Sequence, residues 1–288
     1  MDFLAKLAAA SGARDSLLCI CLDPDTERIP DVLGHGPQAV LKFNRRIIKA
    51  TSEYAAAYKL NLAFYEALGT AAIDVLTLTL QAIPADIPVI ADAKRGDVPN
   101  TAQAYARAFF DVLRFDAITV NPYLGMDAVE PFVREGRYAF AVVRSSNAGA
   151  RDLQDLRLGD GRAVYQAVAE RLAATFPPER CGFVVGATYP DDARDLRRRA
   201  PDRLFLLPGI GPQGGDIAAA VRAALDTRGG GVLPAVARRL LYASSGADFA
   251  DAAARVAAEE RARANAARSE GFPAGPTTAS RMQASRSG

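Results

Sequence analysis

Eight apolar runs separated by segments of helical periodicity constrain the fold of this 288-residue chain more than any other feature. Within each run Val, Ile, Leu and Phe follow one another rather than alternating with polar residues, which is typical of parallel strands covered on both faces. The runs span residues 16–23, 57–64, 88–94, 117–124, 138–146, 181–187, 204–211 and 231–238. Helical patterns between and after them include residues 39–56, 101–113, 162–174, 191–200, 216–225 and 248–268.

Eight such units in a chain of this length predict an α/β protein with a single (β/α)8 TIM barrel over residues 1–268 and no dividing linker. After Arg268 the composition changes to Ser, Gly, Pro and Ala with scattered Arg. Segments of this kind bury too little apolar surface to fold. We therefore expect residues 269–288 to form a disordered tail.

The charge balance excludes some partners. The formal net charge is only +2, and the three arginines and one glutamate from Arg268 onward account for it. A nearly neutral folded part argues against nucleic acid or an acidic membrane surface as a partner. No apolar run could span a bilayer, and the first ten residues lack the pattern of a signal peptide, so we expect a cytoplasmic protein.

Histidine and cysteine offer little chemistry. Cys19, Cys21 and Cys181 lie in apolar runs and are expected to be buried, inert thiols. The single histidine, His35, lies between two glycines in an expected loop. The residues therefore show neither metal-ligand spacing nor a Ser-His or Cys-His pair.

The third apolar run ends in charges of alternating sign. Asp92 and Lys94 should project from one face of this strand, roughly 7 Å apart along the backbone, and Asp97 follows beyond the strand. The alternative is a solvated loop whose ion pair contributes little. In that interpretation Asn100 caps a helix that begins at Thr101.

Polar residues at the carboxyl ends of barrel strands are the informative ones, because active sites of such barrels lie there. Nearly every expected strand supplies at least one: Asp23, Lys59, Asn61, Asp92, Lys94, Asn121, Ser145, Ser146, Asn147, Thr188, Gln213 and Arg238. For Asn121 and Thr188 a structural role, such as a local cap, is the favoured explanation. Two lysines and two aspartates that converge on one mouth favour an active site.

The loop at residues 208–216 follows the seventh run and precedes a helix. Its glycines would leave backbone N–H groups open to an anion, and the helix dipole and Arg238 would favour a phosphate there. Gly209, Gly211 and Gly214 also satisfy the G-x-G-x-x-G pattern of dinucleotide-binding folds. That alternative is weak, because the match falls in the seventh unit rather than in the first.

Taken in order, these residues resemble the orotidine 5'-phosphate decarboxylase family, in particular its longer bacterial subfamily (type 2), over residues 17–268. The D-x-K-x-x-D signature of that family matches Asp92, Lys94 and Asp97. Its first-strand aspartate before proline matches Asp23, and its second-strand lysine matches Lys59. Further matches are Asn121-Pro122-Tyr123, Ser146-Asn147, residues 208–216 and Leu241-Tyr242-Ala243-Ser244.

Two positions depart from the family pattern. Pro212 stands where the family usually has alanine, and Arg239 stands where it has glycine. Counting back from Leu241 assigns phosphate binding to Arg238. Arg239 remains an alternative.

The resemblance implies decarboxylation of orotidine 5'-phosphate to uridine 5'-phosphate and CO2, the last step of de novo UMP synthesis, without metal or organic cofactor. It implies catalytic roles for Lys59, Asp92, Lys94 and Asp97, with Lys94 stabilising a C6 carbanion and donating a proton to it. It also implies a homodimer in which Asp97 and Thr101 serve the partner's site. The implied substrate contacts are Asp23, Asn61, Thr101, Asn121, Ser146, Gln213, Gly214, Gly215 and Arg238.

Two rival functions stay open. D-x-K-x-x-D is shared with related magnesium-dependent sugar-phosphate decarboxylases and synthases, which would ignore pyrimidines. A catalytically silent binder of a phosphate ligand would hold a pyrimidine nucleotide without converting it.

Overall fold

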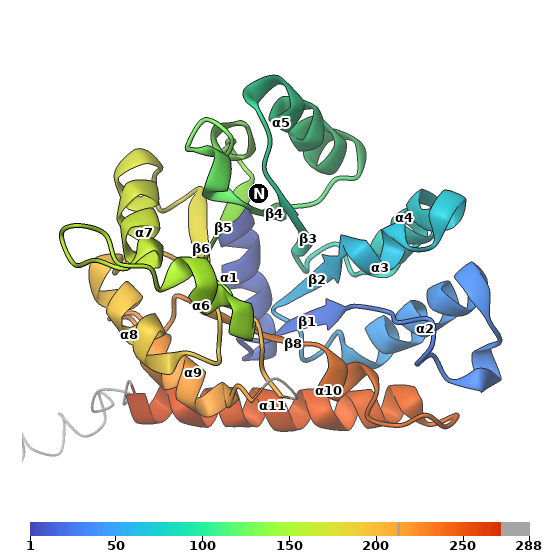
Figure 1. Cartoon of the computed structure of the whole chain (residues 1–288). Helices are drawn as coiled ribbons and strands as arrows, with labels where there is room; N and C mark the ends of the chain where they lie inside the picture. Colours follow the sequence, from blue (N-terminus) through green and yellow to red (C-terminus); the bar gives the residue numbers. More distant parts are fainter. Residues whose placement is uncertain (212–213, 272–288) are drawn as a thin grey trace, which may run out of the picture.

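The computed structural model describes residues 1–211 and 214–271, which form a closed barrel of eight parallel strands in sequence order (Figure 1). The first strand pairs with the second and with the eighth, so the barrel has no free edge. Every strand lies on one of the eight predicted runs, which confirms the TIM barrel. The strands are β1 (Cys19–Leu22), β2 (Ala57–Asn61), β3 (Val89–Arg95), β4 (Ala117–Val120), β5 (Tyr138–Arg144), β6 (Cys181–Val185), β7 (Phe205–Leu207) and β8 (Val232–Val236).

Helices surround the strands. The α-helices are α1 (Phe3–Arg14), α2 (Gly36–Thr51), α3 (Leu62–Glu66), α4 (Ala72–Ala82), α5 (Pro99–Ala106), α6 (Arg151–Gln154), α7 (Val164–Thr175), α8 (Pro190–Arg199), α9 (Ile217–Ala224), α10 (Arg238–Leu241) and α11 (Phe249–Gly271). A π-helical turn over Arg107–Val112 prolongs α5. Short 3-10 turns cover Asp31–Leu33, Gly69–Ala71, Pro122–Leu124, Glu130–Phe132 and Ala148–Ala150.

Several expected element ends were wrong. The strand expected at residues 57–64 ends at Asn61 and is followed directly by α3, and the helix expected at residues 39–56 ends at Thr51. Helix α5 begins at Pro99, and Val98 stands at its N-cap, so Asn100 does not cap it. Proline suits the first helical position because its φ is already helical and its missing N–H is not needed there. Helix α11 continues to Gly271, beyond the expected end at Arg268, and Glu270 in its last turn pairs with Arg222 of α9. The rest of the expected tail, residues 272–288, lies outside the described residues.

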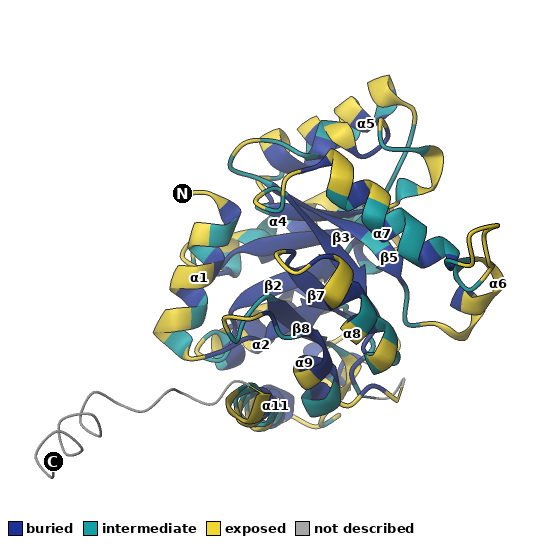
Figure 2. Cartoon of the chain, turned by 90° about the vertical axis from the view of Figure 1, so that its left-hand side faces the viewer, coloured by how far each residue is buried: buried dark blue, intermediate teal, exposed yellow. Residues whose placement is uncertain are grey.

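Helix α1, which the apolar runs did not predict, lies across the amino-terminal end of the barrel. Its Phe3 and Leu7 pack against side chains that fill the barrel interior, such as Tyr138 and Phe140. The rings of Phe3 and Tyr138 stack with 5.0 Å between their centroids. A second apolar layer lies between the strands and the outer helices, so strands are buried while helices expose one face (Figure 2). Side chains thus fill the barrel, and α1 closes its amino-terminal end. Its opening lies at the carboxyl-terminal end.

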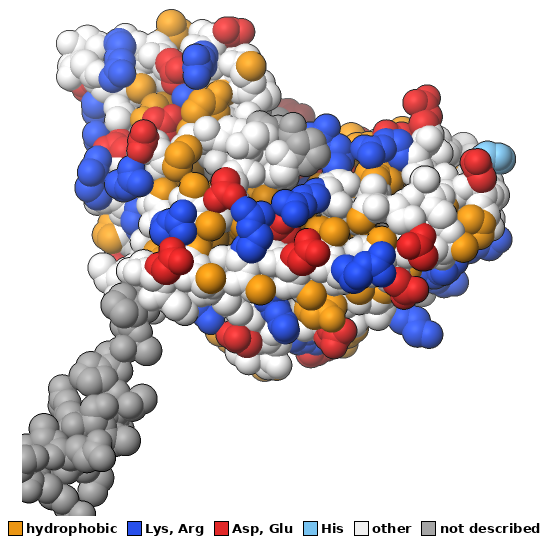
Figure 3. Space-filling model, turned by 90° about the horizontal axis from the view of Figure 1, so that it is seen from below, with side chains coloured by type: hydrophobic (Ala, Val, Ile, Leu, Met, Phe, Trp, Pro, Cys, Tyr) orange, Lys and Arg blue, Asp and Glu red, His pale blue; other side chains and the backbone are white. Residues whose placement is uncertain are grey.

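Charges of both signs are interspersed on the face along α11 (Figure 3). Cys19, Cys21 and Cys181 are buried free thiols, as expected. None of the helices that the structure describes is long and apolar enough to cross a membrane.

Candidate active site

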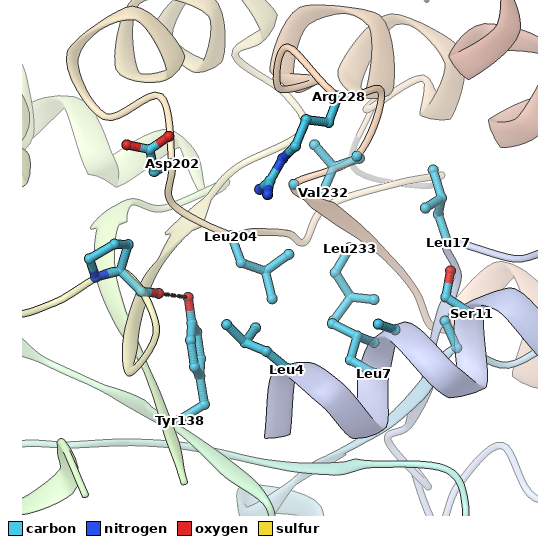
Figure 4. Close-up of a pocket in the computed structure, with 15 residues that line it drawn as sticks. Leu4, Leu7, Ser11, Leu17, Tyr138, Asp202, Leu204, Arg228, Val232 and Leu233 are labelled. Carbon is cyan, nitrogen blue, oxygen red and sulfur yellow. Dashed lines mark hydrogen bonds between the residues drawn. The ribbon is translucent and has the colours of Figure 1, made fainter. Parts of the chain in front are cut away.

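Two cavities mark the two ends of the barrel. The lower one, of about 400 Å³, lies between α1 and the amino ends of β7 and β8, and leucines such as Leu4, Leu7 and Leu233 line it (Figure 4). Its polar groups lie at the edge, and the hydroxyl of Tyr138 donates to the carbonyl of Pro178 at 3.1 Å. Its charged lining is limited to Asp202 and Arg228, whereas the opposite end brings together several acids and bases.

The upper cavity, of about 370 Å³, opens at the carboxyl ends of the strands, and all eight strands or the residues just after them contribute to it. It brings together seven of the predicted site residues. They are Asp23, Lys59, Asn61, Asp92, Lys94, Ser146 and Arg238. The cavity is where the location of active sites in such barrels places it.

Asp92 lies at the centre of a charged cluster. Its Oδ2 accepts a hydrogen bond from Lys59 Nζ at 2.7 Å, and its Oδ1 accepts from Lys94 Nζ at 2.6 Å. Lys59 Nζ also lies 3.6 Å from Asp23 Oδ1, an ion pair longer than a hydrogen bond. Lys59 is buried, whereas 51% of the Lys94 side chain is exposed. The ammonium of Lys94 is therefore the cation that a ligand in the cavity can reach.

Burial and pairing set the protonation of this cluster. Burial alone would lower the pKa of Lys59, but the carboxylates of Asp23 and Asp92 outweigh it and raise that pKa well above its usual value. Burial would likewise raise the pKa of Asp92, but the two ammonium groups hold it below its ordinary range. For Asp23 burial prevails over the attraction of Lys59, so its pKa is raised. Lys59 and Asp92 thus stay charged near neutral pH.

An irregularity in β3 directs the side chain of Lys94 toward the upper cavity. The pairing of β3 with β4 shifts between Ala91 and Arg95, and Lys94 has a φ of 47°, in the left-handed region. Its backbone N–H donates to Thr119 Oγ1 at 2.9 Å, and the same hydroxyl donates to Asp92 Oδ1 at 2.9 Å. A bulge that turns a side chain toward a site is a common feature near active sites. Sequence reasoning missed Thr119, whose one signal was a hydroxyl inside a buried apolar run.

Asp23 presents an unused acceptor to the cavity. Its Oδ1 is buried and has no hydrogen-bond partner among the described residues. The backbone around it is held by Tyr242, whose hydroxyl donates to the carbonyl of Asp23 at 2.9 Å and accepts from the N–H of Asp25 at 2.6 Å. A buried carboxylate oxygen without a donor fits a ligand hydroxyl.

The segment after β5 is held in place by side chains on the side away from the cavity. Gln154 of α6 accepts from the N–H of Ser145 at 3.0 Å and donates to its Oγ at 2.9 Å. Buried Arg144 pairs with Asp155 and Asp192 at 2.6 and 2.8 Å. These contacts fix the strand end that carries Ser146 into the cavity. Thr188, by contrast, has a structural role, because its hydroxyl donates to the carbonyl of Ser146.

In the loop after β7, the glycine N–H groups that we expected to be free for an anion are already hydrogen-bonded. The N–H groups of Gly211, Gly214 and Gly215 donate to carbonyls within the loop. The carboxylate of Asp216 already caps α9, accepting from the N–H of Ala219 at 2.8 Å. Gly214 and Gly215 do not line the upper cavity, and Gln213 lies outside the described residues. A carboxylate has thus taken the helix end that we expected to hold phosphate.

The structure separates the two arginines after β8. Arg238 lines the upper cavity, and its side chain has no hydrogen bond or ion pair to any described residue. Arg239 pairs with Glu260 of α11 at 2.8 Å. An unpaired guanidinium at a cavity edge suits a phosphate, so the geometry favours Arg238 as the phosphate ligand.

Besides Gly214 and Gly215, three predicted residues do not line the cavity of their own chain: Asp97, Thr101 and Asn121. The carboxylate of Asp97 accepts from the N–H of Val98, and Asn121 caps a 3-10 turn by accepting from the N–H of Tyr123 at 3.0 Å. Within residues 1–211 and 214–271, no group of three or more His, Cys, Asp and Glu side chains is placed to hold a metal ion.

Comparisons with known proteins agree with this arrangement. The profile of the orotidine 5'-phosphate decarboxylase / HUMPS family matches residues 16–253. The orotidine 5'-phosphate decarboxylase of Thermomicrobium roseum is 47% identical over 264 residues, which cover 91% of this chain and 94% of that protein. The structure of Leishmania donovani OMP decarboxylase superposes with a TM-score of 0.80 at 39% identity and covers 92% of this chain and 99% of its own.

Leishmania donovani UMP synthase superposes with a TM-score of 0.85 at 40% identity. The match covers 94% of this chain, which spans only 57% of the synthase. The barrel, the charged cluster and these likenesses lead to one conclusion. The chain belongs to the orotidine 5'-phosphate decarboxylase / HUMPS family, as an enzyme of the orotidine 5'-phosphate decarboxylase kind.

Proposed function

We propose that this chain decarboxylates orotidine 5'-phosphate to UMP and CO2 by electrostatic catalysis, without a metal or organic cofactor. The observation that carries the proposal is the position of Lys94. Its ammonium is half exposed in the upper cavity and is held by Asp92, which is itself held by buried Lys59. The likeness to decarboxylases over nearly their whole length supports the same substrate.

The chemistry follows from a fixed cation. When the bond from C6 to the carboxylate breaks, its electron pair stays on C6 and CO2 leaves. The Lys94 ammonium stabilises this carbanion and then transfers a proton to C6, and the amine regains a proton from solvent. Asp92 has a second effect, because its carboxylate lies beside Lys94 and repels the carboxylate of the substrate. That repulsion disappears as CO2 departs.

The remaining groups bind the parts of the substrate that do not react. The free oxygen of Asp23 accepts from a ribose hydroxyl, and Lys59 contacts the same sugar. Ser146, with Gln213, binds the pyrimidine, and Arg238 binds the phosphate. Binding at such distant points can be used to lower the barrier at the reacting carbon, which one ion contact alone would not achieve.

A second subunit completes this site in our proposal. Asp97 and Thr101 follow β3 directly but do not line the cavity of their own chain. We infer that they reach the site of a partner, as the resemblance implies, and that the active unit is a homodimer.

The direct test is to incubate the full chain with orotidine 5'-phosphate and to follow the loss of its absorbance and the appearance of UMP. Lys94→Ala should lower the rate by about 10²–10⁴-fold, because it removes both the cation and the proton donor. Lys42→Ala is the control, since Lys42 is exposed on α2. Full activity of Lys94→Ala would refute the mechanism, and UMP binding without turnover by the unaltered chain would favour the silent binder.

A further inference from the structure

Five charged side chains form a connected network beside the upper cavity. Glu260 of α11 is fully buried and pairs with two arginines, Arg239 at 2.8 Å and Arg263 at 3.1 Å. Arg263 also pairs with Asp216, the residue that ends the β7 loop and caps α9. Arg239 lies additionally 3.8 Å from Glu259. A buried carboxylate shared by two guanidinium groups fixes the positions of both.

The network joins the two segments that flank the phosphate end of the cavity. At one end Arg239 directly follows Arg238, whose guanidinium lines the cavity. At the other end Asp216 directly follows Gly215 in the loop after β7. The stem of Arg239 also lies beside this loop, because a Cβ built on Gly211 would come within 3.3 Å of the Cβ of Arg239. Arg239 thus lies beside the loop and is also linked to its end, Asp216, through Glu260 and Arg263.

The network is not suited to be a second phosphate site. Two arginines face three carboxylates, Glu259, Glu260 and Asp216, so the network has no excess of positive charge and the guanidinium groups already have partners. Arg238 differs, because it has no partner among the described residues. The role of Arg239 is therefore to position its neighbours rather than to bind the ligand itself.

We propose that Arg239 is a positioning residue that sets, through Glu260, the spacing between Arg238 and the loop after β7 and so strengthens binding of the substrate phosphate. The inference rests on the proposed function for the identity of the substrate. It is particular to this chain, because the resemblance expects glycine at this position. A glycine would leave Glu260 to Arg263 alone and would remove the packing on Gly211.

The test compares Arg239→Gly with Arg239→Lys, which keeps a cation facing Glu260. On the full chain, calorimetric titration gives the dissociation constants of UMP and of uridine, which lacks the phosphate. Arg239→Gly should weaken UMP binding about tenfold and change uridine binding by less than about twofold, and Arg239→Lys should restore part of the loss. The KM for orotidine 5'-phosphate should rise in parallel, with kcat little changed.

Arg222→Ala is the matched control. Arg222 pairs with Glu270 and so also joins α9 to α11, but it does not contact the loop after β7. This variant should bind both ligands as the unaltered chain does. Equal weakening of UMP and uridine in Arg239→Gly, or no weakening of UMP, would overturn the inference.

The same data separate this inference from the proposed function. If the unaltered chain fails to turn over orotidine 5'-phosphate, the proposed function falls, but the comparison of UMP with uridine still decides the role of Arg239. If the unaltered chain binds UMP no better than uridine, the role of Arg239 falls as well. Should Arg239→Gly not fold, Arg239→Lys alone decides, because it must weaken UMP more than uridine.

Discussion

The carboxylates of Asp92 and Asp23 lie in the same cluster, but they differ in their hydrogen bonding. Asp92 accepts from two ammonium groups and one hydroxyl. The Oδ1 of Asp23 lies 3.6 Å from Lys59 Nζ, too far for a hydrogen bond, and it lacks a hydrogen-bond partner among the described residues. Groups that await a ligand in this way reduce stability, which is common where a site is organised for binding.

This contrast gives a stability prediction for Asp23→Asn. Burial raises the pKa of Asp23, so the folded state disfavours its carboxylate form. The resulting penalty is absent below the unfolded pKa of about 3.9 and develops as pH rises through the folded pKa. Asp23→Asn should therefore increase the free energy of unfolding at pH 7 while lowering activity.

Urea unfolding at several pH values measures this effect. The gain should shrink as pH falls toward about 4, since Asp23 is then increasingly protonated in both states. A variant less stable than the unaltered chain at pH 7, or a gain independent of pH, would count against this account of Asp23.

At the scale of elements, the segment from β3 to α5 divides the D-x-K-x-x-D motif between two environments. Asp92 and Lys94 lie on the strand and line the cavity, whereas Asp97 lies beyond it and contacts the N–H of Val98. The bulge opposite Thr119 marks where the strand pairing shifts. In the dimer that we propose, the same short segment would serve two sites.

Mixing two inactive variants tests this division. Lys94→Ala and Asp97→Asn homodimers should each be nearly inactive. In a random mixture, half of the dimers are mixed and hold one intact site each, so activity should recover to about a quarter of the unaltered level. No recovery after subunit exchange has been verified by mass spectrometry would contradict a shared site.

The sequence predicted the strands and most of the site for a physical reason. Strands buried on both faces must be continuously apolar, so a charge at the end of such a run, as at Asp92, stands out. The use of backbone donors cannot be read in this way. Gly214 and Gly215 permit an open loop, but whether their N–H groups face a ligand or a carbonyl depends on tertiary geometry. The capping of α9 by Asp216 was missed for the same reason.

At the scale of the whole molecule, the barrel is covered at its amino-terminal end and open at its carboxyl-terminal end. Helix α1 covers the amino-terminal end of the barrel, where Phe3 stacks on Tyr138 and meets Phe140 edge-on. Nothing in the apolar runs predicted this, because the helix contributes few buried residues and its contacts are far apart in sequence. The two ends of the barrel thus separate stability from chemistry.

Phe3→Ala should therefore destabilise the protein without affecting catalysis. Removing a buried aromatic ring costs about 3–5 kcal/mol, while kcat should stay unchanged because the cavity with Lys94 lies at the other end. Val32→Ala, at an exposed position, should change stability by less than about 0.5 kcal/mol. Denaturant unfolding measures both, and equal stability of the two variants would contradict the role of α1.

We propose that the cluster of Lys59, Asp92 and Lys94 decarboxylates orotidine 5'-phosphate without a metal or organic cofactor. The most direct measurement follows loss of this substrate by the full chain before and after exhaustive treatment with a chelator. We predict equal rates, with one UMP formed for each substrate consumed. Loss of activity on chelation that magnesium restores, or tight UMP binding with no turnover, would contradict the claim.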